Sequence, residues 1–263
     1  MATYVFHKLS DLKKRANRLA REENRQRHDA LDETARRGGY QNYAHARVWL
    51  PDLQSSPFHR IEIYQRWRDT KARLAGTASV TVKLRTPLLE LIKLHQLEGY
   101  LGGCTLPHAT RVDVDGFMRD KSASRQDVMR VARALQFMDA TRLKPSGSQR
   151  RYPKGKWDNR PELADHDHGW YDPEARVHLL MSEPYRGDSA ESPAHLAWEQ
   201  RHGWRTIKVE RTSIYGLGTE LFLMGPEHYL PTLAAKVARL MRSPDPLAPE
   251  AVETTEHPLP RGF

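Results

Sequence analysis

The stretch 124-SRQDVMRVARALQFM-138 gives the strongest local signal for secondary structure in this chain. Ser124 and Asp127 have the S-x-x-D spacing of a capping box, in which side chains satisfy the backbone N–H groups at a helix start. Apolar residues then recur at three- and four-residue steps and share one helical face: Val128, Val131, Leu135 and Met138. The stretch therefore predicts an amphipathic helix near the middle of the chain.

Strands and further helices are predicted on both sides of this helix. Runs rich in β-branched and aromatic residues predict strands at 59–67, 78–84, 176–181, 205–210 and 219–224. Cap and proline signals predict helices from Thr86-Pro87 to about Leu97, from Ser192-Pro193 to about His202, and at 231–241. Because the order does not alternate strictly, we expect an α+β domain over 57–242, with a mixed or antiparallel sheet and packed helices.

The N-terminal part, residues 1–52, predicts a separate module of three short helices. Residues 11–23 form an amphipathic pattern behind Ser10, a plausible N-cap. A second helix at 27–37 ends at Gly38-Gly39, and a third at 41–50 ends before Pro51. At the other end, the proline-rich tail 243–263 is expected to be irregular.

Three segments resemble known bacterial sequences. The run 12-LKKRANRLAREENRQRHDALDETARRGGYQNYAHAR-47 resembles a helical module that is found ahead of glyoxalase-like domains. The pieces 167-DHGWYDP-173 and 183-EPY-185 resemble an uncharacterised bacterial family often encoded on plasmids and integrated elements. The resemblance implies a bacterial, cytoplasmic protein of a mobile element, and it assigns no catalytic residues.

Composition points to the same compartment. The single cysteine, Cys104, excludes an internal disulfide and a cysteine-rich zinc module, as is usual in a reducing compartment. No run of residues approaches the ~20 apolar residues of a membrane helix, and the first residues lack the apolar core of a secretion signal. We therefore expect a cytoplasmic protein that does not associate with a membrane.

The net charge of +9 is unevenly distributed. Residues 121–160 hold eleven Lys or Arg against three Asp or Glu, whereas residues 161–200 hold two against nine. Residues 1–50 carry a second basic excess, of eleven against six. Basic blocks of this kind are typical of proteins that bind a polyanion, although they also arise for solubility alone.

Two basic regions are candidate nucleic-acid contacts. In the N-terminal module, the glycine turn between two helices permits a helix-turn-helix arrangement, with a docked helical hairpin as the alternative. The segment 141–161 is predicted to be a long loop in which cationic side chains alternate with aromatic rings. It either binds phosphates and unpaired bases or forms ion pairs with the acidic block. The candidate residues are Lys13, Lys14, Arg18, Gln41, Asn42, Arg47, Arg142, Lys144, Arg150, Arg151, Tyr152, Lys154, Lys156 and Trp157.

The acidic block contains a second kind of candidate. His166 and His168 are two residues apart, which on a strand would direct both rings to one face, and His178 and Glu183 follow. The set could hold a divalent metal for a hydrolase, supply an acid/base pair, or form a polar turn beside the basic loop. Cys104, with His108 nearby, is either a nucleophile or a small buried hydrophobe.

These patterns favour a nucleic-acid-binding accessory protein that uses the N-terminal helices and the loop 141–161, with DNA or RNA left open and no cofactor expected. Two alternatives remain. One is a metal-assisted hydrolase centred on His166, His168 and Glu183, and the other is a module that binds a protein partner.

Overall fold

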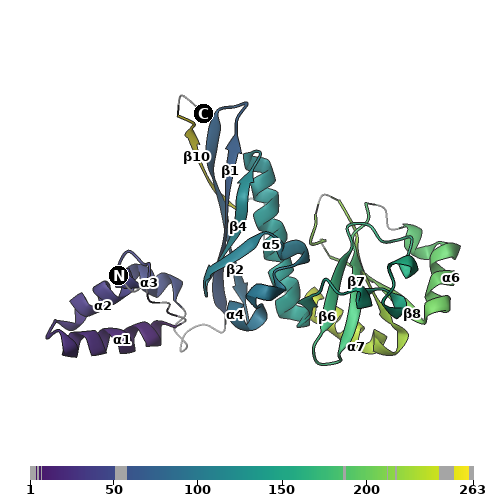
Figure 1. The fold of residues 1–263 in the computed structure, drawn as a ribbon, viewed down its shortest axis with the longest axis horizontal. Helices are drawn as coiled ribbons and strands as arrows, with labels where there is room; N and C mark the ends of the chain where they lie inside the picture. The colour runs from purple at the N-terminus through teal and green to yellow at the C-terminus, as the bar shows by residue number, and fades with distance from the viewer. Residues whose placement is uncertain are drawn as a thin grey trace.

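The computed structural model describes residues 4, 6, 8–50, 58–185, 188–211, 213–216, 218–242 and 252–260. Figure 1 shows a small helical module, a central sheet with a long helix along it, and a second sheet flanked by helices. The predicted α+β class, with a three-helix module at the N-terminus, is confirmed. The part of the chain that the structure describes contains no helix long and apolar enough to cross a membrane.

The N-terminal module contains α1 (Leu9–Glu22), α2 (Arg27–Arg37) and α3 (Tyr43–Trp49). Its small core gathers apolar side chains from all three helices and the segments beside them: Phe6, Leu9, Leu12, Ala35, Tyr40, Ala46 and Leu50. The predicted N-cap was wrong, because Lys8 occupies that position and Ser10 lies inside the first turn. The turn at Gly38-Gly39 is confirmed: a Cβ on Gly38 would lie 2.6 Å from the Phe6 ring, and Gly39 has φ +85°.

The first sheet has the strand order β10-β2-β1-β4-β3. β1 (His59–Asp69) and β2 (Leu74–Leu84) form a long antiparallel hairpin, and β4 (Arg111–Met118) pairs with β1 in parallel. β3 (Cys104–His108) closes the other edge. The chain between β2 and β3 forms α4 (Leu88–Leu91) and two 3-10 turns, η1 (Leu94–Gln96) and η2 (Gly99–Leu101).

The single helix predicted from Thr86-Pro87 to Leu97 was therefore wrong. Pro87 is the N-cap rather than the first helical residue, and the helix ends where Ile92 adopts extended dihedrals, φ −142° and ψ 145°. Leu91 and Ile92 are both fully buried. The apolar residues that suggested a longer helix are therefore buried by a short helix and the extended residue that follows it.

The C-terminal tail is the second correction. Residues 243–251 and 261–263 of the predicted irregular tail lie outside the described residues, but β10 (Glu253–Pro258) is a strand that pairs antiparallel with β2. The hydroxyl groups of Thr77 and Thr255 lie 2.7 Å apart across this pair. The outer edge of β2 would otherwise present unpaired N–H and C=O groups, and β10 satisfies them.

Helix α5 (Lys121–Thr141) lies between the two sheets, as Figure 1 shows. It confirms the predicted central helix, but the capping box was wrong. Asp120 is the N-cap and accepts the N–H of Ala123 at 2.8 Å, while Ser124 is fully buried inside the helix. In the C-terminal half almost every residue is buried, so α5 is covered by apolar neighbours nearly all round.

The second sheet is antiparallel, with the order β5-β6-β7-β9-β8. Its strands are β5 (Lys144–Pro145), β6 (His168–Asp172), β7 (Val177–Ser182), β8 (Trp204–Val209) and β9 (Leu221–Pro226). One face packs on α5 and α7 (Leu230–Met241), where the rings of Phe137 and Trp170 lie 4.6 Å apart. The other face carries a separate core with Tyr152, Trp198 and Phe222, covered partly by α6 (Pro193–His202).

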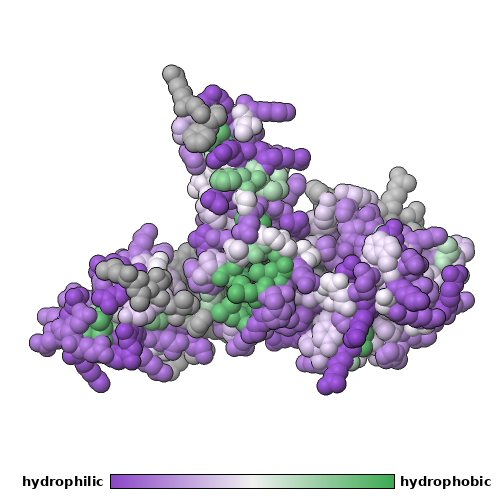
Figure 2. Space-filling model, in the orientation of Figure 1, coloured by the Kyte–Doolittle hydropathy of each residue, from purple (hydrophilic) through white to green (hydrophobic). Residues whose placement is uncertain are grey.

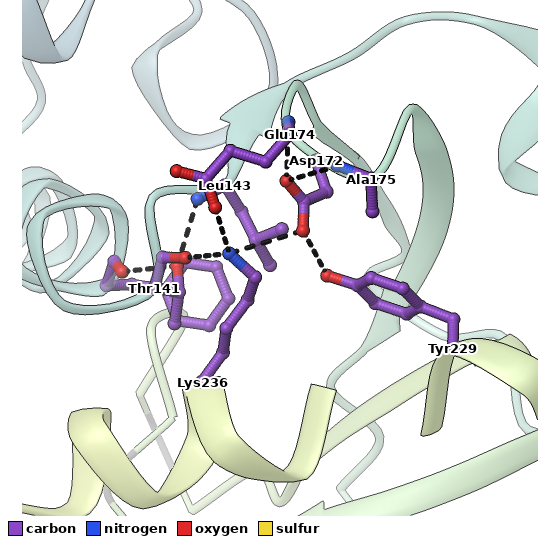
Figure 3. Close-up of polar contacts among 8 residues, drawn as sticks. Thr141, Leu143, Asp172, Glu174, Ala175, Tyr229 and Lys236 are labelled. Carbon is purple, nitrogen blue, oxygen red and sulfur yellow. Dashed lines mark hydrogen bonds and ion pairs between the residues drawn. The ribbon is translucent and has the colours of Figure 1, made fainter. Parts of the chain in front are cut away.

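A buried ion pair joins α7, β6 and the end of α5 (Figure 3). The ammonium of Lys236 lies 3.2 Å from Asp172 Oδ2 and donates to the carbonyl of Thr141 at 2.9 Å. Asp172 also accepts the Tyr229 hydroxyl at 2.5 Å and the N–H of Glu174 at 2.9 Å. Burial favours the neutral carboxyl, but these donors lower the pKa of Asp172 below its usual value.

We predict that Asp172→Ala destabilises the protein by about 3–5 kcal/mol, because it leaves the Lys236 ammonium buried without its partner. Glu174→Gln is the matched control, since Glu174 approaches the same ammonium at 4.0 Å but is 78% exposed. Its cost should stay within about 1 kcal/mol. Urea unfolding of both variants measures the difference, and equal losses would contradict a structural role for the buried pair.

Candidate functional site

The basic segment 141–161 is folded rather than an extended loop, which corrects the sequence interpretation. Its first residue ends α5, β5 pairs with β6, and three 3-10 turns follow at Gln149–Arg151, Pro153–Gly155 and Trp157–Asn159. Tyr152 anchors the turns: its side chain is fully buried and its hydroxyl donates to Asp167 Oδ2 at 2.6 Å. Tyr152 is therefore not available to stack on a base, contrary to the prediction.

Three of the predicted cations in this segment have structural partners. Arg142 adopts a left-handed conformation, φ 64°, at the end of α5, and its guanidinium donates to the Thr86 hydroxyl. The ammonium of Lys144 donates to the carbonyls of Leu91 and Glu90, and burial lowers its pKa. The guanidinium of Arg151 lies 5.0 Å from the centre of the Tyr152 ring. The predicted ligand contacts of Arg142 and Lys144 are therefore replaced by contacts within the protein.

The remaining cations form an exposed cluster, which we call the basic turn cluster: Arg150, Lys154, Lys156 and Arg160, with Trp157 among them. The Trp157 side chain is 47% exposed, its ring meets Tyr152 edge-on at 5.1 Å, and the Arg160 guanidinium lies 4.7 Å from its centre. The indole of Trp198 donates to the Asn159 carbonyl at 2.7 Å, which fixes the last turn against α6. The cluster thus places four cations around one aromatic ring, with the exposed carboxylate of Asp158 in the same turn as Trp157.

The acidic block does not neutralise this cluster. Within the described ranges, no ion pair joins a Lys or Arg of 141–161 to a carboxylate of 161–200. Asp167 instead accepts from Tyr152, and Asp172 and Glu183 are fully buried with partners of their own. The interpretation that the two blocks exist to pair with each other is therefore wrong for the described part of the chain.

In the N-terminal module, the predicted contacts have mixed roles. Asn42 is the N-cap of α3 and accepts the N–H of His45 at 2.8 Å, so its side chain is occupied. Arg18 lies 3.8 Å from Glu22, and Lys13 also has a partner. Lys14, Gln41 and Arg47 are exposed. Helix α3 has only seven residues, and the Asn42 side chain before it is used as the N-cap. This arrangement favours the docked helical hairpin over a helix that reads bases in the DNA major groove.

The three histidines of the metal hypothesis point to different neighbours. The ring of His166 stacks on Tyr215 at 4.2 Å, whereas that of His168 packs on Tyr100 at 3.8 Å. His178 lies on β7 beside Tyr171 and Ser146. His166 has φ 46° and precedes β6, so the two-residue spacing does not direct both rings to one face. Among the described residues, no group of three His, Cys, Asp or Glu side chains could hold a metal ion.

Glu183 is a buried carboxyl rather than an accessible acid/base group. Its two oxygens accept the N–H groups of Ile214 and Tyr215 at 2.7 and 2.6 Å, and the side chain is fully buried. Burial raises the pKa of Glu183 to about 7 and lowers that of His168 to about 4. The hydroxyl of Tyr100 faces this carboxyl, and burial and the nearby charge raise its pKa well above the usual value.

Tyr100 was not predicted, because only the folded chain brings η2 beside β6 and β7. The Tyr100 ring packs on His168 and its hydroxyl faces Glu183, so the three side chains form one group, which we call the Tyr100–His168–Glu183 network. A substrate has no access to the Glu183 oxygens in this arrangement. Cys104 is buried on β3, and burial raises the pKa of its thiol to about 12, which keeps it protonated at neutral pH.

The hydropathy of the visible surface differs between the central part of the molecule and the two parts beside it. Figure 2 shows hydrophilic colour over most of the N-terminal module and the second-sheet region, with hydrophobic colour gathered on the central part.

Comparison with known proteins gives no further guide to function, because no family model, curated protein or solved structure matches the chain.

The buried network predicts two opposite dependences of stability on pH. Glu183 holds its proton more tightly in the folded protein than in the unfolded chain. Its contribution to the free energy of unfolding is therefore full below pH 4.5 and falls as the pH rises to about 7. His168 holds its proton less tightly, so its contribution is full above pH 6.5 and falls as the pH drops to about 4. Between these limits the two trends oppose each other.

Urea unfolding at several values between pH 5 and 6.5 tests this pair. Relative to the wild type, Glu183→Gln should gain stability as the pH rises, and His168→Asn should lose it, each by up to about 2 kcal/mol. A loss of stability that the new amide groups cause equally at every pH does not affect the change with pH, which is the quantity compared. Parallel pH profiles for the three proteins would rule out the network as described.

Proposed function

We propose that the protein binds nucleic acid through the basic turn cluster at 150–160. The observation that supports this most is the combination of four exposed cations around a half-exposed tryptophan, with no described carboxylate of the adjacent acidic block paired to them. Phosphates are the strongest common anionic partners for such a surface, and an exposed indole stacks on an unpaired base.

The anchoring of the turns that carry the cluster supports this proposal. Long cationic side chains lose entropy when they are fixed, and a mobile loop would lose backbone entropy as well. Here Tyr152 and Trp198 already hold the turns in place through their bonds to Asp167 and Asn159. Binding therefore has less backbone entropy to overcome than it would at an unanchored loop. Exposed Lys14 and Arg47 in the N-terminal module add a second, sequence-independent contact.

The hydrolase alternative has less support from the geometry. Its three proposed residues face different partners, and Glu183 is closed off by two backbone N–H groups. Metal analysis of protein purified without a histidine tag remains the direct test. Stoichiometric zinc or manganese that is lost in His168→Ala would restore this alternative.

We predict that affinity for nucleic acid falls steeply with salt and that the basic turn cluster carries much of that dependence. Replacing Arg150, Lys154, Lys156 and Arg160 by Gln should reduce the slope of log K against log salt by up to about 3 for a single strand. Fluorescence anisotropy across a salt series measures this slope.

The control removes the same number of charges elsewhere, by replacing Arg205, Lys208, Arg239 and Arg242 with Gln. These side chains lie on β8, α7 and the residue after α7. Because both variants have the same net charge, only a localised contact gives different slopes. Equal slopes would mean that net charge alone attracts the nucleic acid, and a wild type that binds nothing would end the proposal.

We also predict that Trp157→Ala weakens binding of a single strand by about 1–3 kcal/mol without changing the salt dependence, because stacking releases no counterions. The same anisotropy series measures both quantities. Thermal unfolding of the variant must first show that the turns remain folded, since Trp157 also contacts Tyr152. An unchanged affinity would show that the indole does not touch the ligand.

A further inference from the structure

The open face of the first sheet carries aromatic rings and arginines in a regular arrangement. Ile61, Ile63 and Trp67 on β1 are buried, so the alternating side chains of Tyr64, Arg66 and Arg68 lie on the opposite face. The sequence 64-YQRWR-68 contained this signal, with Tyr64 and Arg66 in the strand predicted over 59–67 and Arg68 directly after it. It was not recognised because the strand was interpreted only as a structural element.

A bulge brings a second aromatic ring to the same place. The pairing of β1 with β4 shifts between Gln65 and Arg66, where Gly116 has φ +79°, and Phe117 becomes the partner of Arg66. The Phe117 side chain is 51% exposed, and the guanidinium groups of Arg66 and Arg68 each lie 4.7 Å from its centre. A bulge that redirects one side chain at a sheet edge often marks a functional position.

The rings and arginines border a cleft of about 380 Å³. Tyr64 and Phe117 line it from β1 and β4, and His257 and Leu259 line it from β10 and the residues after it. Its volume falls within the ~300–1,000 Å³ usual for small-molecule sites. A flat, half-exposed ring flanked by cations is suited to a planar ligand that carries negative charge.

Charge around the cleft fits the same ligand. Arg66 makes no ion pair with a carboxylate in the described part of the chain, and its guanidinium lies over the Phe117 ring. Lys71 is exposed at the hairpin tip, where the nearest acid in sequence, Asp69, accepts the N–H of Ala72 at 2.9 Å. Lys121 and Glu256, 3.3 Å apart, neutralise each other.

We propose that this face, the hairpin cleft, binds unpaired nucleotides of a single strand, with a base on Phe117 and the adjoining phosphate beside Arg66. This inference rests on the proposed nucleic-acid binding and adds a second site of defined ligand class. Base pairs in a duplex hide their faces within the stack, so Phe117 can select only single-stranded or flipped-out bases.

The test compares a labelled oligothymidylate with a duplex of equal length, by fluorescence anisotropy at fixed salt. Phe117→Ala should lower affinity for the single strand about 5- to 150-fold and leave duplex binding unchanged. Phe117→Tyr keeps a stacking ring and should retain most of the affinity. Leu196→Ala removes an apolar side chain of similar exposure, 47%, from α6 and should change neither measurement.

The outcomes separate the two proposals. If the wild type binds neither oligonucleotide, both fail. If the basic turn cluster variant loses binding while Phe117→Ala binds the single strand like the wild type, the hairpin cleft is not a nucleotide site and the proposed function stands. A loss in Phe117→Ala that is equal for single strand and duplex would also overturn base stacking at this ring.

Discussion

The burial of helix α5 between two sheets is the constraint on which the rest of the fold depends. The helix is covered on one side by β1 and β2 and on the other by strands β6 and β7 with α7, so each sheet completes the core of the other. The basic turn cluster follows α5 in the chain, and the hairpin cleft lies on the sheet that α5 covers, so both depend on this one helix.

Buried polar groups reinforce this shared core where the elements meet. The Asp172–Lys236 pair ties α7 to β6 and to the last carbonyl of α5, and the Tyr100–His168–Glu183 network ties η2 to the second sheet. Charged groups in such positions are weak sources of net stability, because desolvation offsets their attraction. They do penalise other arrangements, since a shifted element would leave a charge buried without its partner.

Local patterns predicted much of this architecture, and tertiary contacts account for what they missed. The period of α5 and the alternation of β1 and β2 are local, so these elements were predicted correctly. The roles of Tyr152, Arg142 and Lys144 depend on residues far away or on burial that no local pattern encodes. The same limit applies to the histidines, because a spacing of two predicts a common face only if both residues lie in one strand, and His166 does not.

The pairing of β10 with β2 has a consequence for synthesis. Residues 253–258 complete a sheet whose other strands emerge from the ribosome well over a hundred residues earlier, as the separation of 178 between Thr77 and Thr255 shows. Until then the β2 edge is open to pairing with other chains, which makes the nascent protein vulnerable to aggregation. Chaperone demand should therefore track the interval between translation of β2 and that of β10, rather than the stability of the finished fold.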